Sequence, residues 1–104
     1  MARFDVYRHP DATQRTHTPY LLDGQNEYIS GLNPRVVLPL RLAERVAIPL
    51  RDLNPALDVD GVAVILDTAA IGAVPLSFLK GPVANLRAQA SVVTNALDAL
   101  FGGY

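Results

Sequence analysis

Residues 56–66 read Ala56-Leu-Asp-Val59-Asp60-Gly61-Val62-Ala-Val-Ile-Leu66, and this stretch decides the fold class. An Asp-Gly pair between two apolar runs favours a two-residue hairpin turn, because both turn positions need a positive φ. The pattern predicts antiparallel strands over 56–59 and 62–67. Since residues 62–66 are apolar on both faces, the second strand is expected in the middle of a sheet, covered on each side.

Three more strands are predicted before the hairpin. Phe4 and Val6 alternate with polar neighbours, which is typical of a short half-buried strand over 3–7. A second strand is predicted over 20–25, with Gly24 marking a bulge or its end. A third strand covers 35–40. Loops are expected over residues 9–19 and 26–34, and an irregular excursion is expected over 41–53. Residues 68–79 are expected to form either a bent strand or an interface segment.

The end of the chain predicts a helix. Apolar residues recur at steps of three and four from residue 83, namely Val83, Leu86, Ala90, Val93, Leu97 and Leu100. Pro82 suits a first helical turn, and Gly102-Gly103 is a typical stop, so a helix of about five turns is expected. The fold class is therefore mainly β (α+β): a small SH3-like antiparallel β-barrel with a long C-terminal α-helix, forming one domain over 1–104.

Composition limits the classes of function. The 104 residues are 50% hydrophobic and 18% charged, with a net charge of −1. A disordered chain is excluded, and a general nucleic-acid binder would be strongly basic. The low charge of residues 68–79 and of the helix indicates apolar surface left for a second copy, so a homodimer is expected.

No cysteine is present, so the chain has no disulfide framework and no thiolate metal site. The N-terminus lacks the apolar run of a signal peptide, and the longest uncharged stretch, 68–79, is too short to span a bilayer. A cytoplasmic location without membrane association is the expectation.

Candidate catalytic residues are few. His9 and His17 share one polar loop without a third ligand nearby, so no metal site or cofactor is predicted. Asp58 and Asp60 flank the hairpin turn, and turn formation explains them better than acid–base chemistry. No phosphate-binding glycine motif or nucleophile elbow is present, and we expect no enzymatic activity.

The arginines are unevenly distributed. Seven of the eight lie within residues 1–51, interspersed with acidic residues. A mixed solvated surface is the favoured interpretation. The alternative is an arginine cluster that meets an acidic peptide or RNA phosphates.

The C-terminal sequence Phe101-Gly102-Gly103-Tyr104 is either a frayed end or an aromatic tip that enters a partner's pocket. Because Phe101 adjoins the apolar stripe, it is expected to dock on the domain. Tyr104 is then the better candidate for an exposed contact.

Four segments, taken in order, resemble one family. They are Phe4-Asp5-Val6-Tyr7, Arg35-Val36-Val37-Leu38-Pro39-Leu40, Ala73-Val74-Pro75-Leu76-Ser77 and Asn95-Ala96-Leu97-Asp98-Ala99-Leu100-Phe101. Their order and spacing, together with the chain length, resemble the CcdB family of bacterial toxins over nearly the whole sequence.

The resemblance implies a dimeric toxin of a type II toxin–antitoxin system. Such toxins bind the A subunit of DNA gyrase and trap the enzyme on cleaved DNA. A CcdA-like antitoxin, itself a DNA-binding dimer with a disordered tail, wraps the toxin, and together they repress their operon. No direct nucleic-acid binding is expected without the antitoxin.

The resemblance also implies a gyrase-binding site. Carried over by position, its residues are Tyr28 and Ile29 in a loop and Asp98, Phe101, Gly102, Gly103 and Tyr104 at the helix end. Ile29, Phe101 and Gly103 match the family pattern. Gly102 stands where the family has a tryptophan central to gyrase poisoning, Tyr104 replaces an aliphatic residue, and Asp98 replaces an asparagine.

Two alternatives remain open at this point. A CcdB-like protein that has lost gyrase poisoning can act on another target or serve as an antitoxin-binding decoy. A MazF-like endoribonuclease would need a cluster at a phosphate groove, for which Arg35, Asp23 and His17 are the candidates.

Overall fold

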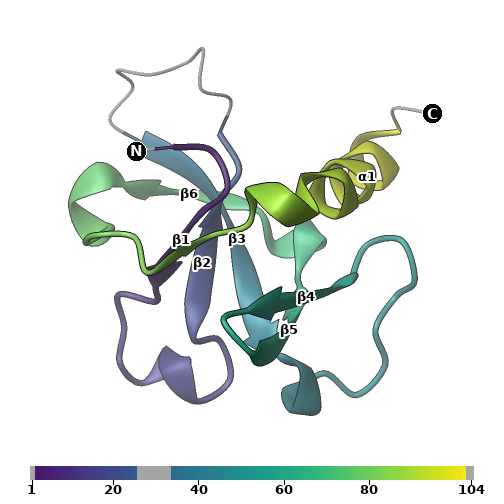
Figure 1. Ribbon diagram of the computed structural model, residues 1–104, viewed down its shortest axis with the longest axis horizontal. Helices are drawn as coiled ribbons and strands as arrows, with labels where there is room; N and C mark the ends of the chain where they lie inside the picture. Colours follow the sequence, from purple (N-terminus) through teal and green to yellow (C-terminus); the bar gives the residue numbers. More distant parts are fainter. Residues whose placement is uncertain (1, 26–33, 103–104) are drawn as a thin grey trace.

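The computed structural model describes residues 2–25 and 34–102. Within them, one antiparallel sheet curls into a nearly closed barrel, and a helix follows it (Figure 1). The strands are β1 (Asp5–Arg8), β2 (Tyr20–Asp23), β3 (Pro34–Leu42), β4 (Ala56–Val59), β5 (Val62–Leu66), β6 (Gly72–Pro75) and β7 (Ala84–Asn85), and the helix is α1 (Ala90–Phe101). The predicted small barrel with a C-terminal helix is confirmed.

The long strand β3 organises the barrel. It pairs with β2 on one edge, whereas on the other its first half pairs with β6 and its last residues pair with β5. The sheet therefore runs β4-β5-β3-β2-β1-β7, with β6 attached to β3. The nine residues of β3 are enough for two separate strands to pair along the same edge.

The Asp-Gly hairpin forms as predicted. Asp60 and Gly61 have φ values of 48° and 88°, and Val59 pairs with Val62. The amide of Gly61 also donates a 2.6 Å hydrogen bond to the Asp58 carboxylate. Strand β5 lies between β4 and β3, in the interior of the sheet as expected.

The helix is shorter than predicted. α1 has 12 residues and begins at Ala90, whereas residues 84–85 form β7 beside β1. The amides of Val83 and Leu86 donate to the carbonyls of Val6 and Phe4, both at 2.8 Å. The open edge of β1 offers carbonyls that need donors, and this pairing outweighs the helical spacing of the side chains.

The uncharged segment 68–79 contains one short strand, β6, so the predicted bent strand is confirmed only for residues 72–75. Two 3₁₀ turns, η4 (Thr68–Ala70) and η5 (Leu76–Phe78), stand on either side of β6. Leu79 then turns inward and is buried, while Leu76 and Phe78 are 38% and 51% exposed.

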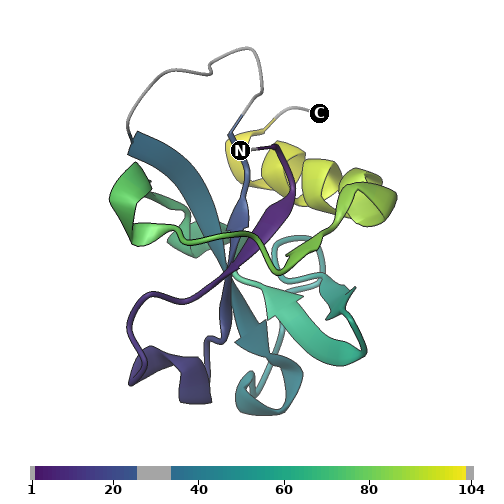
Figure 2. The same ribbon diagram turned by 60° about the vertical axis from the view of Figure 1, so that its left-hand side comes forward.

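Strand alternation separates two clusters of buried residues. Val6, Leu22, Leu38 and Leu40 pack with Val93 and Ala96 of α1, which lies across one end of the barrel (Figure 2). Tyr7, Leu21 and Val37 point to the opposite face and pack with Leu79. Successive side chains of a strand point to opposite faces, so β1, β2 and β3 each serve both clusters. Among the described residues, no helix is long and apolar enough to cross a membrane.

Candidate functional site

The tip of α1 is the part of the predicted gyrase-binding site that the structure describes. Gly102 ends the helix in the left-handed region, with φ 69° and ψ 35°, and its amide donates to the Asp98 carbonyl. Glycine adopts this conformation without a steric penalty, so the predicted stop is confirmed at Gly102. Asp98 is half-buried on the last turn.

The expectation that Phe101 docks on the domain is wrong. Its side chain is 70% exposed. The apolar face of α1 ends with Val93, Ala96 and Leu97 against the core, and Phe101 lies one turn beyond Leu97. The tip therefore presents an unshielded aromatic ring.

The other four predicted contact residues, Tyr28, Ile29, Gly103 and Tyr104, lie outside the described residues. The described chain does show what flanks residues 26–33. Gln25 stands just past β2 and Pro34 begins β3.

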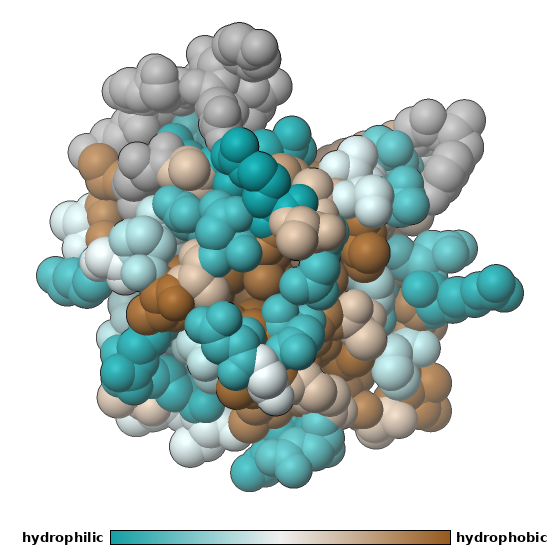
Figure 3. All heavy atoms as spheres, in the orientation of Figure 1, coloured by the Kyte–Doolittle hydropathy of each residue, from teal (hydrophilic) through white to brown (hydrophobic). Residues whose placement is uncertain are grey.

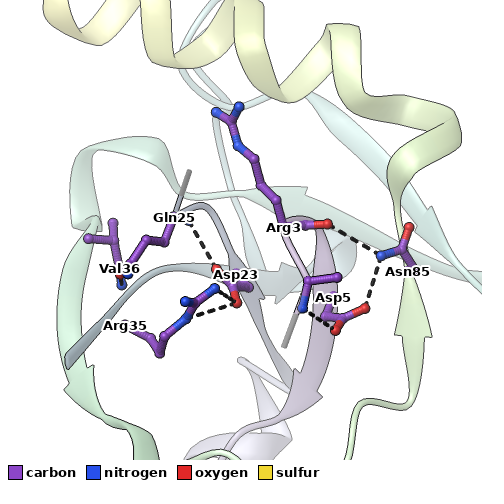
Figure 4. A network of polar contacts seen from close by, with 8 residues as sticks. Arg3, Asp5, Asp23, Gln25, Arg35, Val36 and Asn85 are labelled. Carbon is purple, nitrogen blue, oxygen red and sulfur yellow. Dashed lines mark hydrogen bonds and ion pairs between the residues drawn. The ribbon is translucent and has the colours of Figure 1, made fainter. Parts of the chain in front are cut away.

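A buried ion pair joins the strands at this point (Figure 4). Nη2 of Arg35 lies 2.5 Å from Oδ2 of Asp23, and Nε lies 3.2 Å from the same oxygen. The two side chains are 5% and 0% exposed. The Gln25 amide donates to Oδ1 of Asp23 and the Val36 amide donates to Oε1 of Gln25, each at 3.0 Å. Both flanks of residues 26–33 are thus held by one hydrogen-bond network, in which the bonds to the Asp23 carboxylate are charge-assisted.

The cluster proposed for ribonuclease chemistry is not assembled. Arg35 and Asp23 do meet, but both are buried and occupied with each other. His17 precedes β2, whereas Asp23 ends it, and the His17 ring bonds to the Thr18 hydroxyl at 2.9 Å. The three side chains therefore do not converge on one accessible phosphate site.

A second feature, the basic groove, was not predicted as a site. It is a cavity of about 830 Å³ whose lining includes Arg8, Asp11, Arg15, Phe78, Lys80 and Val83. Three cations face one carboxylate, and Phe78 and Val83 supply apolar surface. On the face seen in Figure 3, hydrophobic side chains emerge in several places between hydrophilic ones. The excess of arginine in residues 1–51 was the signal in the sequence, but it did not show which arginines share a groove.

Hydrogen bonds shape the loop that forms one wall of the groove. Nε of Arg15 donates to the His9 carbonyl at 2.6 Å, and the Asp11 amide donates to Nδ1 of His9 at 3.1 Å. Burial lowers the pKa of His9 below its ordinary value. Hydrogen bonds from the Thr13 hydroxyl and amide lower the pKa of Asp11. At neutral pH the groove therefore keeps an ionised Asp11, and the loop that carries Asp11 keeps a neutral His9.

Both histidines are half-buried within this loop. In the parts of the chain covered by the structure, no three His, Cys, Asp or Glu side chains gather as metal ligands would. Within the described residues, the basic groove offers charged and apolar surface, and the tip of α1 offers an exposed aromatic side chain.

Comparison with known proteins bears on what these two surfaces are for. The family model described as CcdB protein matches residues 3–103. No individual curated protein matches the sequence. Since the family match spans essentially the whole chain, this protein belongs to the CcdB family.

Proposed function

We propose that this protein is a type II toxin that binds the A subunit of DNA gyrase, traps the gyrase–DNA cleavage complex and is neutralised by a CcdA-like antitoxin. Family membership indicates a toxin of a toxin–antitoxin system. The proposed action is binding without catalysis or a cofactor, by a homodimer in the cytoplasm.

The observation that carries the gyrase proposal is the exposure of Phe101. A ring that is 70% exposed, at the end of a packed helix, is a preorganised hydrophobic contact. Aromatic anchors are common binding hot spots, and truncating one costs about 2 kcal/mol or more. Gly102 supplies no side chain beside it, so Phe101 is the aromatic contact on the described part of this tip.

The basic groove supports the antitoxin part of the proposal. Arg8, Arg15 and Lys80 outnumber Asp11, and exposed Phe78 lies among them. A segment with acidic residues and an apolar anchor complements this lining. The gyrase contact is assigned to the α1 tip and the antitoxin contact to the basic groove. A substitution in one surface can therefore be tested without changing the other.

The homodimer proposal is supported by the exposed apolar surface of residues 72–78. Gly72, Ala73 and Pro75 are exposed on β6, and Leu76 and Phe78 follow them. A monomeric mass in sedimentation at micromolar concentration would argue against a dimer.

The test is plasmid cleavage by purified gyrase with ATP and the protein. Linear, protein-linked DNA is expected with the wild type and with Arg8→Ala, a change at an exposed groove residue outside the apolar surface of residues 72–78. Phe101→Ala is expected to require about 30-fold more protein, which corresponds to 2 kcal/mol. Arg8→Ala should instead weaken binding of the acidic antitoxin tail.

The antitoxin-decoy alternative is favoured by one specific observation, the absence of a tryptophan at Gly102. It predicts antitoxin binding by a folded protein with no DNA cleavage at any concentration. Cleavage of RNA in the absence of gyrase would instead support the ribonuclease alternative.

A further inference from the structure

A strained turn just before β1 carries Arg3. The Asp5 amide donates to the Ala2 carbonyl at 3.1 Å, and the Ala2 amide donates to Oδ2 of Asp5 at 2.9 Å. Phe4, the third residue of the turn, has a φ of 72°. This left-handed conformation is costly for an aromatic residue and persists only where the surrounding contacts hold it. The turn therefore fixes the point at which the Arg3 side chain leaves the backbone.

The Arg3 guanidinium is held in place but has no counter-ion. Its Cζ atom lies over the Phe4 ring, 4.9 Å from the centroid, which is within the range of a cation–π contact. Neither ion pair among the described residues includes Arg3, and its Nε atom is buried without a hydrogen-bond partner there. The two Nη atoms donate no hydrogen bond to a described residue and, unlike Nε, are not buried. Both can therefore donate to an acceptor from outside the chain.

Arg3 lies beside both elements that the resemblance connects with the gyrase contact. The Phe4 amide donates to the Asp23 carbonyl at 2.8 Å, so the turn adjoins residues 23–25, which precede the predicted contact segment 26–33. Figure 4 shows the Arg3 side chain pointing toward α1 and away from Asp5. A partner that contacts α1 on this side can therefore also reach the Arg3 guanidinium.

A carboxylate is the acceptor that suits the two Nη atoms best. Its two oxygens can accept parallel hydrogen bonds, one from each Nη atom. Because Nε is buried, the side-on arrangement through Nε is closed and the carboxylate must approach end-on. A DNA phosphate is less favoured, since the net charge of −1 and the nearby Asp5 carboxylate do not attract a polyanion.

We infer that Arg3 binds an aspartate or glutamate side chain of the gyrase A subunit, with one carboxylate oxygen on each Nη atom. The inference rests on the proposed gyrase contact at the α1 tip and adds a polar contact to the aromatic contact of Phe101. Phe101 supplies affinity by burying apolar surface. Arg3 supplies specificity, because a guanidinium fork pairs well only with a correctly placed carboxylate.

The test is direct binding to the purified gyrase A subunit without DNA, measured by calorimetry. Arg3→Gln is expected to weaken binding about tenfold and to reduce its dependence on salt, because a charge-assisted contact is lost. Arg3→Lys keeps the charge but not the fork, so it should still bind about fivefold more weakly than the wild type. The thermal midpoints should fall by no more than about 4 °C, as the loss of one cation–π contact implies.

Arg45→Gln is the matched control. It makes the same change of charge at an exposed position in the 3₁₀ turn η3 (Ala43–Arg45), which follows the end of β3 farthest from Pro34. Affinity for the gyrase A subunit should stay within about twofold of the wild type, as expected for a solvated surface charge.

Four outcomes would overturn the inference. If folded Arg3→Gln binds as tightly as the wild type, Arg3 makes no such contact, while the gyrase proposal stands. Wild-type affinity in Arg3→Lys rules out the paired hydrogen bonds, and this variant decides the matter if Arg3→Gln does not fold. An effect of Arg3→Gln that appears only when DNA is added assigns the contact to a phosphate. If the wild type does not bind the gyrase A subunit at all, the proposed function fails and the inference fails with it.

Discussion

The two ends of β3 use the same chemistry in different surroundings. Arg35, near the start, pairs with Asp23, and both side chains are at most 5% exposed. Arg41, near the end, pairs with Asp67 at 2.7 Å, with the side chains 34% and 25% exposed. The first end flanks residues 26–33, and the second bonds to residues 17–18, where the loop over the basic groove returns to the barrel. Because the first pair is buried and the second is partly exposed, we expect the first to matter more to stability.

Among variants at the two ends of β3, Asp23→Leu is expected to cause the largest loss in the free energy of unfolding. It leaves the Arg35 guanidinium buried without its counter-ion, which typically costs about 3–5 kcal/mol. Urea denaturation measures the loss in the free energy of unfolding. The double variant Asp23→Leu/Arg35→Met should recover much of it, because no unpaired charge then remains. A loss of under about 1 kcal/mol in the single variant would show that water reaches the pair.

Gly24→Ala tests the same end without touching a charge. A Cβ at Gly24 would lie 2.5 Å from Cδ1 of the buried Leu38, so the side chain or the strand must shift. Overpacking of this kind costs about 1–3 kcal/mol. Gly81→Ala is the matched control, since a Cβ there meets no atom within 4 Å. Equal thermal midpoints for the two variants would mean that Leu38 adjusts freely.

Arg41→Met is expected to cost only about 1 kcal/mol. The change removes the bond to Asp67 and a 2.7 Å bond to the Thr18 hydroxyl, but water can replace the guanidinium at this partly exposed position. Chemical denaturation with and without high salt provides the measurement. A loss as large as that of Asp23→Leu would erase the difference between the two ends.

Local signals in the sequence predicted the elements whose cause is local. The Asp60-Gly61 turn and the Gly102 stop both depend on positive φ, which the residue types reveal. The predicted start of α1 was wrong because residues 83–86 form backbone hydrogen bonds with the strand β1 and its neighbour Phe4. These partners lie nearly 80 residues earlier in the sequence. The exposure of Phe101 and the convergence of Arg8, Arg15 and Lys80 likewise depend on long-range packing, so neither followed from spacing alone.

Acidification is expected to destabilise the loop that forms one wall of the basic groove. This loss of stability is expected to be smaller than the losses caused by the substitutions above. His9 has its pKa lowered from 6.5, chiefly by burial, so the folded protein binds its proton less readily than the unfolded chain does. The stabilisation is therefore present above about pH 6.5 and is lost as the pH falls through the folded-state pKa. Protonation also removes the Nδ1 acceptor that holds the Asp11 amide, which loosens the wall beside Arg15. NMR titration of the His9 ring and amide exchange of residues 9–16 measure both effects. His9→Asn should abolish this pH dependence of exchange while β3 stays protected, and loosening of β3 in the same pH range would mean that the two ends are not independent.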